Sequence, residues 1–178
     1  MPQLHKHLNV VRHLLKSMTY KEFIRDFKLQ TESLSYQKQI DLAISICKKL
    51  FFDYQKFSED NNWGSPDLIL DTIKFIEETK ALTVDKELLK KKYNQIVSIT
   101  PDTEDFGDAD YALNSCAAVC ETLDFLTDHK AEHIYAIGTC LTDTIDFKIQ
   151  EDADLTEDEI DKNPEMIATR KFLMEVTR

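Results

Sequence analysis

Two histidines, His129 and His133, stand four residues apart, and this spacing could serve metal chemistry. On a helix, residues four apart share a face, so two imidazoles could point toward one zinc ion. A zinc site needs at least three protein ligands, and the pair lacks both the adjacent glutamate of a metalloprotease helix and an evident third ligand. We therefore interpret the pair as a polar helix start and keep His129 and His133 as weak metal candidates.

A second pair, Cys116 and Cys120, has the same spacing within an apolar run. Cysteines that bind zinc or exchange disulfides usually have two intervening residues and electropositive, partly exposed surroundings. The alanine, valine and leucine neighbours would instead raise the thiol pKa, so core packing is the better interpretation. Cys47 and Cys140 also lie in apolar patterns, and four such cysteines indicate a reducing compartment, the cytoplasm.

Two acidic segments, DTEDFGDAD and EDADLTEDEID, could bind a divalent cation, since hard cations prefer several carboxylate oxygens. Neither segment fits an EF-hand loop, because the first lacks the closing acid and the second lacks the turn glycine. Acids also favour helix N-termini, so we interpret these residues as helix caps first and as an interaction surface second. The candidate interaction or ligand surface consists of Asp102, Glu104, Asp105, Asp108, Asn114 and Glu121.

Motifs of the common enzyme classes are missing from the sequence. It contains no Glu-x-x-His for a di-iron bundle, no glycine-rich phosphate loop and no Gly-x-Ser-x-Gly elbow. We therefore assign no catalytic residue, expect no cofactor and favour a protein that is not an enzyme. The formal net charge of −11 would repel a phosphate backbone, which argues against nucleic acid as a partner.

The elements that must position these residues are helices. Only 3 Gly and 4 Pro occur, and apolar residues recur at helical spacing along most of the chain. The pattern predicts an all-α fold: a single compact bundle of about seven to nine helices, forming one domain over residues 1–178. Four helix starts are marked by a capping box or by a cap residue before proline, at Thr19, Ser65, Thr156 and Asn163.

A helix over about 109–127 is expected at the centre of the bundle, capped by Asp108. One of its faces carries small side chains that let neighbouring helices approach closely, and its members are Ala109, Ala112, Leu113, Cys116, Ala117, Cys120 and Leu123. Gly138, in the next predicted helix, offers another close approach. The amphipathic residues 1–18 predict an extra N-terminal helix, which could join two copies into a homodimer. No stretch is long and apolar enough to predict a membrane span.

Three sequence blocks together resemble a known family. They are YQKFSEDNNWGSPDLILDTI, the acidic loop followed by ALNSCAAVCETLDFL, and LTEDEIDKNPE. As a set they resemble the YjaG-like family of uncharacterised bacterial proteins, a domain-of-unknown-function family, from about Phe23 to Val176. The resemblance implies a compact all-α fold in a bacterial cytosolic protein, and it brings no catalytic residues.

Two functional hypotheses follow. The first is a non-enzymatic protein-binding or regulatory domain that uses an acidic surface to bind a basic partner, as immunity-like proteins do. The alternative is a small-molecule or metal-dependent activity in a groove beside the central helix, drawing on Asp105, Asp108, Asn114, Glu121, His129 or His133. A concave site where at least two of these residues converge would distinguish the second hypothesis from the first.

Overall fold

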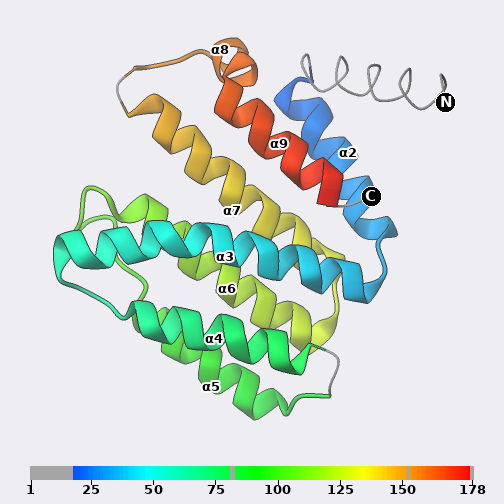
Figure 1. Ribbon diagram of the computed structural model, residues 1–178, viewed down its shortest axis with the longest axis vertical. Helices are drawn as coiled ribbons and strands as arrows, with labels where there is room; N and C mark the ends of the chain where they lie inside the picture. Colours follow the sequence, from blue (N-terminus) through cyan, green and yellow to red (C-terminus); the bar gives the residue numbers. More distant parts are fainter. Residues whose placement is uncertain (1–17, 81–82, 152, 177–178) are drawn as a thin grey trace, which may run out of the picture.

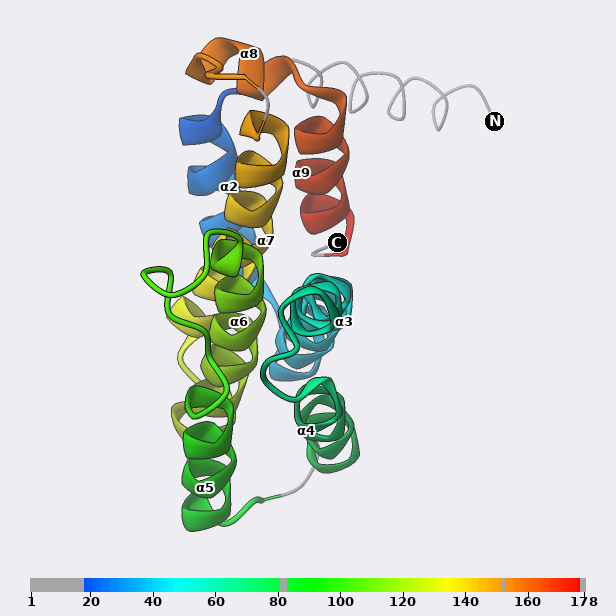
Figure 2. The same cartoon turned by 90° about the vertical axis from the view of Figure 1, so that its left-hand side faces the viewer.

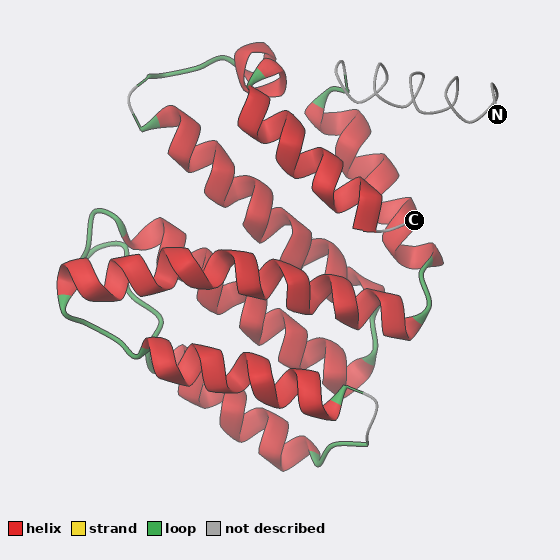
Figure 3. Cartoon of the chain, in the orientation of Figure 1, coloured by secondary structure: helices red, strands yellow, loops and turns green. Residues whose placement is uncertain are grey.

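The computed structural model describes residues 18–80, 83–151 and 153–176, and every regular element within these ranges is a helix (Figures 1 and 3). The described helices are α2 (Tyr20–Ser33), α3 (Tyr36–Asn61), α4 (Pro66–Thr79), α5 (Lys86–Val97), α6 (Ala109–Asp128), α7 (Ala131–Gln150), α8 (Glu157–Lys162) and α9 (Pro164–Val176). The predicted all-α fold is thereby confirmed. The predicted helix over residues 1–18 lies outside the described residues, apart from Met18.

Across the described parts of the chain, no helix is long and apolar enough to cross a bilayer. The cytoplasmic location suggested by the four cysteines stays a prediction.

Two helix starts form the predicted capping boxes. In the first, the Thr19 hydroxyl accepts a hydrogen bond from the Glu22 N–H at 3.3 Å, and the Glu22 carboxylate accepts one from the Thr19 N–H at 3.0 Å. Thr156 and Glu159 repeat the arrangement at α8, with an N–H to carboxylate distance of 2.9 Å. Each box satisfies backbone donors that the first helical turn would otherwise leave unpaired.

Two other predicted caps make different contacts. The Ser65 hydroxyl makes no capping bond, and its backbone N–H donates instead to the Tyr54 hydroxyl at 3.2 Å. Asp108 has φ −112° and ψ 16°, outside the extended conformation in which a side chain reaches back to cap a helix. Its carboxylate instead accepts a hydrogen bond from the Asn61 side chain at 3.1 Å, which ties the start of α6 to the end of α3.

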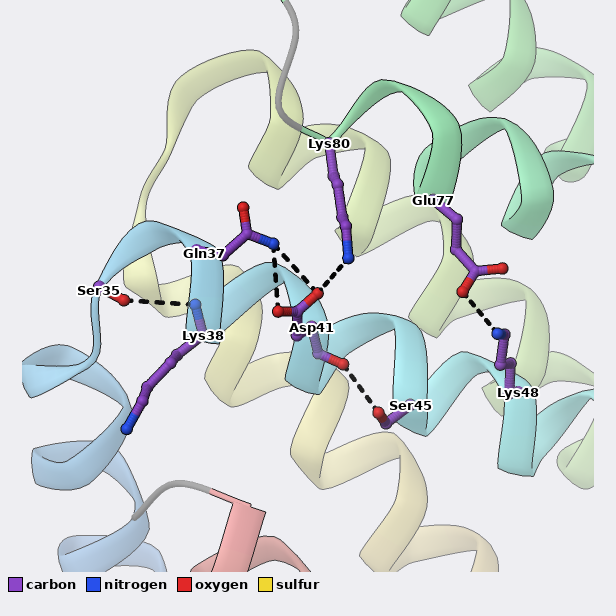
Figure 4. Close-up of polar contacts among 8 residues, drawn as sticks. All are labelled: Ser35, Gln37, Lys38, Asp41, Ser45, Lys48, Glu77 and Lys80. Carbon is purple, nitrogen blue, oxygen red and sulfur yellow. Dashed lines mark hydrogen bonds and ion pairs between the residues drawn. The ribbon is translucent and has the colours of Figure 1, made fainter.

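Helix α3 is one continuous element of 26 residues, about 39 Å long at the standard rise, and it runs across the whole molecule (Figure 1). It ends at Asn62, which has φ 49° in the left-handed region. Helix α4 packs along it, and polar contacts join the two helices at the surface (Figure 4). Lys80 reaches Asp41 at 2.5 Å, and Lys48 reaches Glu77 at 2.6 Å.

Helix α6 lies at the centre, between α3 and α7, as the small-residue face predicted. Most of the predicted face is buried, with Ala109, Ala112 and Cys116 fully inaccessible, but Leu113 is 36% exposed and Ala117 is only half-buried. Other side chains of the helix are buried as well: Ser115, Ala118, Val119, Thr122 and Phe125. Burial raises the pKa of the Cys116 and Cys120 thiols to about 12, which agrees with a packing role for both.

Helices α2, α7 and α9 lie side by side at one end of the molecule (Figure 2). Helices α4 and α5 lie at the other end. Gly138 of α7 lies directly beside a ring of α2. A Cβ placed on Gly138 would lie 2.2 Å from Cε1 of Phe27, a fully buried ring on α2. The missing side chain therefore makes the space into which the Phe27 ring packs.

Candidate protein-binding groove

The four acidic residues predicted before α6 lie together in one loop. The Asp102 carboxylate accepts a hydrogen bond from the Glu104 N–H at 2.9 Å, and the Asp102 carbonyl accepts one from the Asp105 N–H at 3.1 Å. Asp102, Glu104 and Asp105 are exposed, and Asp108 bonds to the Asn61 side chain as described above. These carboxylates therefore shape their own turn, and their arrangement is that of a solvated loop.

The other candidate residues lie further along α6. The Asn114 side chain donates to the Thr144 hydroxyl of α7 at 3.1 Å, so it joins two helices. Glu121 lies thirteen residues beyond Asp108, about 20 Å along the helix axis. The structure thus spreads the six predicted surface residues over the loop before α6 and along the helix as far as Glu121, and it does not gather them at one site.

Glu121 and His133 are brought together. The Glu121 carboxylate lies 2.6 Å from Nδ1 of His133, and the Asp128 carboxylate lies 3.1 Å from Nε2. Burial acts to lower the His133 pKa, but the hydrogen bonds with the two carboxylates outweigh it and the pKa is raised above 6.5. With both ring nitrogens engaged, the imidazole joins the end of α6 to the start of α7.

His129 occupies a different environment from His133. It ends α6 with φ 60°, in the left-handed conformation, and its ring contacts Tyr36 edge-on at a centroid distance of 4.9 Å. Among the described residues, no three or more His, Cys, Asp or Glu side chains are placed to hold a metal ion. The spacing of the two histidines therefore produces two separate structural contacts in this fold.

A groove of about 550 Å³ lies between α3, α7 and α9, and we call it the α3–α7–α9 groove. Helices α3 and α9 both pack on α7, so α7 forms the floor and the other two form the walls. Leu141 and Ile145 supply an apolar floor and are only 6% and 8% exposed. The walls and rim are made by Lys48, Lys49, Phe52, Asp53, Lys148, Glu165, Ala168, Thr169 and Phe172.

The exposed aromatic side chain of this groove is Phe52, on the α3 wall. Its side chain is 69% exposed, and its ring touches that of Phe51 at a centroid distance of 5.9 Å. On the opposite wall, the Phe172 ring lies 4.4 Å from the Lys49 ammonium, a cation–π distance. An exposed aromatic ring beside an apolar floor is an energetically favourable anchor for a binding partner.

Charge in the groove differs from the charge of the whole chain. The Lys148 ammonium pairs with Asp53 at 2.5 Å, and Lys48 is turned toward Glu77 of α4 (Figure 4). Lys49 has no carboxylate within ion-pair distance in the described chain. Three lysines and two acids line the groove, so it carries a small positive charge on a protein whose net charge is −11.

The groove lining includes no histidine or cysteine among the described residues. It therefore offers hydrophobic contact and charge. The sequence contained one signal for it: Phe52 stands between Lys48, Lys49 and Lys56 on the polar face of an amphipathic helix. The contribution of α9 could not be inferred, because Phe172 comes beside Lys49 only when the chain folds.

Residues 26–178 match the family described as "Protein of unknown function (DUF416)". The chain belongs to this family. The DUF416 match begins close to Phe23, where the sequence resemblance was expected to begin, and it spans every residue of the α3–α7–α9 groove. The narrower YjaG-like name stays a prediction.

A solved structure of a DUF416 family protein from Shewanella baltica OS155 is similar, with a TM-score of 0.75. The two sequences are 18% identical, and the similarity covers 85% of this chain and 82% of that one. At this identity the comparison shows the shared DUF416 fold alone. No match was found among curated proteins.

Proposed function

We propose that this DUF416 protein is a non-enzymatic binding domain that holds an amphipathic helix of a partner protein in the α3–α7–α9 groove. The observation that carries the proposal is the 69% exposed Phe52 ring beside the floor made by Leu141 and Ile145. Amphipathic helices bind such grooves by inserting side chains spaced three, four and seven residues apart. Such a domain would regulate its partner and, if the partner is a toxin, would act as an immunity-like protein.

Local charge indicates which helix would fit. The net charge of −11 favours a basic partner over the surface as a whole, but screening limits such attraction to about 8 Å at physiological salt. Within that range, the groove presents Lys49 and Lys148. We therefore expect a partner helix with an apolar face flanked by at least one carboxylate near Lys49.

The other hypotheses have less support from the geometry. For a small-molecule or metal-dependent activity beside α6, the candidates Glu121 and His133 do meet, at 2.6 Å, but Asp108 lies about 20 Å from Glu121 along the helix axis. The described residues also place no three His, Cys, Asp or Glu side chains to hold a metal ion. A homodimer formed through residues 1–18 stays a separate prediction. Comparing the elution volumes of the full chain and of a chain without those residues tests it.

A direct test is selection from a displayed library of amphipathic helical peptides, each roughly 16 residues long, with varied charges beside the apolar face. Selected peptides should carry carboxylates beside that face. Phe52→Ser should weaken their binding by at least about tenfold, as expected for loss of a buried aromatic anchor. Lys49→Glu should weaken binding most for the peptides that carry those carboxylates.

Phe147→Ser is the matched control, because Phe147 of α7 is 41% exposed and does not line the groove. It makes the same chemical change at an exposed phenylalanine, and peptide affinity should not change. Equal affinity of the selected peptides for the wild type and for Phe52→Ser would show that the groove is not their binding site. A library without any selectable binder would also contradict the proposal.

A further inference from the structure

Arg170 of α9 is the one charged residue in the described chain that is fully buried, with 3% of its surface exposed. Its guanidinium lies against the Tyr20 and Phe23 rings of α2, at centroid distances of 5.6 and 5.5 Å. Nη1 donates to the Met18 carbonyl at 3.2 Å and forms an ion pair with the Asp161 carboxylate at 2.8 Å. This side chain therefore joins α2, α8 and α9.

The guanidinium is incompletely satisfied. Its Nε is buried and has no hydrogen-bond partner among the described residues. Arginine has five N–H donors in a fixed planar arrangement, so Nε cannot turn toward another acceptor without breaking the contacts of Nη1. Buried polar groups are nearly always hydrogen-bonded, so Nε of Arg170 is a donor that a water or a ligand beside it would satisfy.

A cavity of about 250 Å³ adjoins this arginine, outside the α3–α7–α9 groove. It is bounded by α2, α7, α8 and α9, and its polar lining includes Tyr20, Thr142, Asp143, Asp146, Asp161 and Arg170. One water occupies about 30 Å³ of liquid volume, so the cavity has room for considerably more than a single water molecule. Its size suits a small organic molecule.

A second unsatisfied atom lines the same cavity. Oδ1 of Asp146 is buried and has no hydrogen-bond partner in the described chain, although Gln150 bonds to the same carboxyl group. Asp143, one helical turn earlier on α7, is exposed at the edge of the cavity. The cavity thus presents an unused donor from Arg170 and an unused acceptor from Asp146.

Charge distinguishes the ligands that such a cavity could hold. Four carboxylates, from Asp143, Asp146, Glu157 and Asp161, line it against one guanidinium. An anionic ligand would be repelled by the uncompensated acids, whereas an ammonium group would be attracted to Asp146 and Asp143 and could donate to the unused oxygen. An oxygen elsewhere on the same ligand would accept from Nε.

We propose that this cavity is a binding site for a small primary amine that also carries an oxygen acceptor, such as an amino alcohol or a basic amino acid. The ammonium group donates to Oδ1 of Asp146, with Asp143 nearby, and the oxygen accepts from Nε of Arg170. This site is independent of the α3–α7–α9 groove, so failure of either proposal leaves the other in place.

Compounds with the same five-carbon chain provide the test by calorimetry and thermal shift. The probes are 5-amino-1-pentanol, cadaverine, 1,5-pentanediol and glutarate, with lysine as the larger amine. The amino alcohol and lysine should bind, since a ligand that binds only the native state raises its melting temperature. Cadaverine should bind more weakly because it lacks the oxygen, and the diol and glutarate should not bind. Stronger binding of glutarate, or no binding of any amine up to about 10 mM, would overturn the proposal.

Variants of Asp146 locate the binding site. Asp146→Asn keeps the shape of the side chain and removes its charge, so affinity for the amino alcohol should fall by at least about tenfold while the far-ultraviolet spectrum stays that of the wild type. Asp71→Asn, on the exposed face of α4, is the matched control and should bind normally. Because Arg170 also holds three helices together, its substitution would mix folding with binding, and the test therefore rests on Asp146. Unchanged affinity in Asp146→Asn would place the ligand elsewhere.

Discussion

Gly138→Ala should destabilise the protein, although the same change in most helices has the opposite effect. In a helix interior, alanine is favoured over glycine by about 1 kcal/mol. Here the added Cβ would lie 2.2 Å from Cε1 and 2.5 Å from Cζ of Phe27. The ring is 0% exposed and stacks on Phe23 at a centroid distance of 5.5 Å, so it cannot move aside freely.

The size of the effect follows from these opposing contributions. Overpacking a core costs about 1–3 kcal/mol, and a fixed ring more than an ångström too close places this site at the upper end. Subtracting the gain in helix propensity of about 1 kcal/mol leaves a net loss of about 2 kcal/mol. For a chain of this length, that corresponds to a fall in Tm of about 4–8 °C.

Urea unfolding of the wild type and of the variants named below would measure this effect. Gly107→Ala is the matched control, because a Cβ there would meet no atom within 4 Å. It should change the free energy of unfolding by less than about 0.5 kcal/mol. Phe27→Leu should partly relieve the clash, so the double variant should be more stable than the sum of the two single changes predicts. A Gly138→Ala protein more stable than the wild type would refute this account of the contact between α2 and α7.

Two further predictions concern polar contacts. Tyr54→Phe should lower the free energy of unfolding by about 2 kcal/mol, because the hydroxyl donates to the Ile99 carbonyl at 2.9 Å and accepts from the Ser65 N–H; an unchanged Tm would contradict this. The raised pKa of His133 means that its contacts stabilise the fold fully below about pH 6.5 and lose that contribution as pH rises through the folded-state pKa. The difference in urea midpoint between the wild type and His133→Asn should therefore shrink from about pH 5.5 to 8.5, and a difference that grows with pH would have the wrong sign.

Much of the fold follows from local sequence. Capping boxes at Thr19 and Thr156 form as predicted because all their partners lie within three residues. The position of α6 was predictable from its small side chains, and the structure extends it only to Asp128. At Ser65 the structure differs from the prediction: its hydroxyl makes no capping bond, and its backbone N–H donates to the Tyr54 hydroxyl, a partner that the local capping pattern does not indicate.

The sites were less predictable. In the sequence, Arg170 is an ordinary charged residue in the middle of a short helix, and its burial depends on Met18 and Tyr20, which are about 150 residues away. Asp146 likewise lies on a helix with a mixed pattern, where nothing local indicates an unpaired oxygen. Charge and motif searches select exposed clusters such as the loop at Asp102, whereas the cavity is created by the packing of four helices.

The position of α6 also has a consequence for hydrogen exchange. Its side chains are buried around most of the helix circumference, whereas α8 has no buried residue and consists of six residues. Opening α6 would require α3, α5 and α7 to separate, so its amide hydrogens should exchange only when the whole molecule unfolds. The amide hydrogens of α8 should exchange through a small local opening that breaks the contact between Asp161 and Arg170. Protection against exchange should therefore be highest in the central helix α6 and lowest in α8, the shortest described helix.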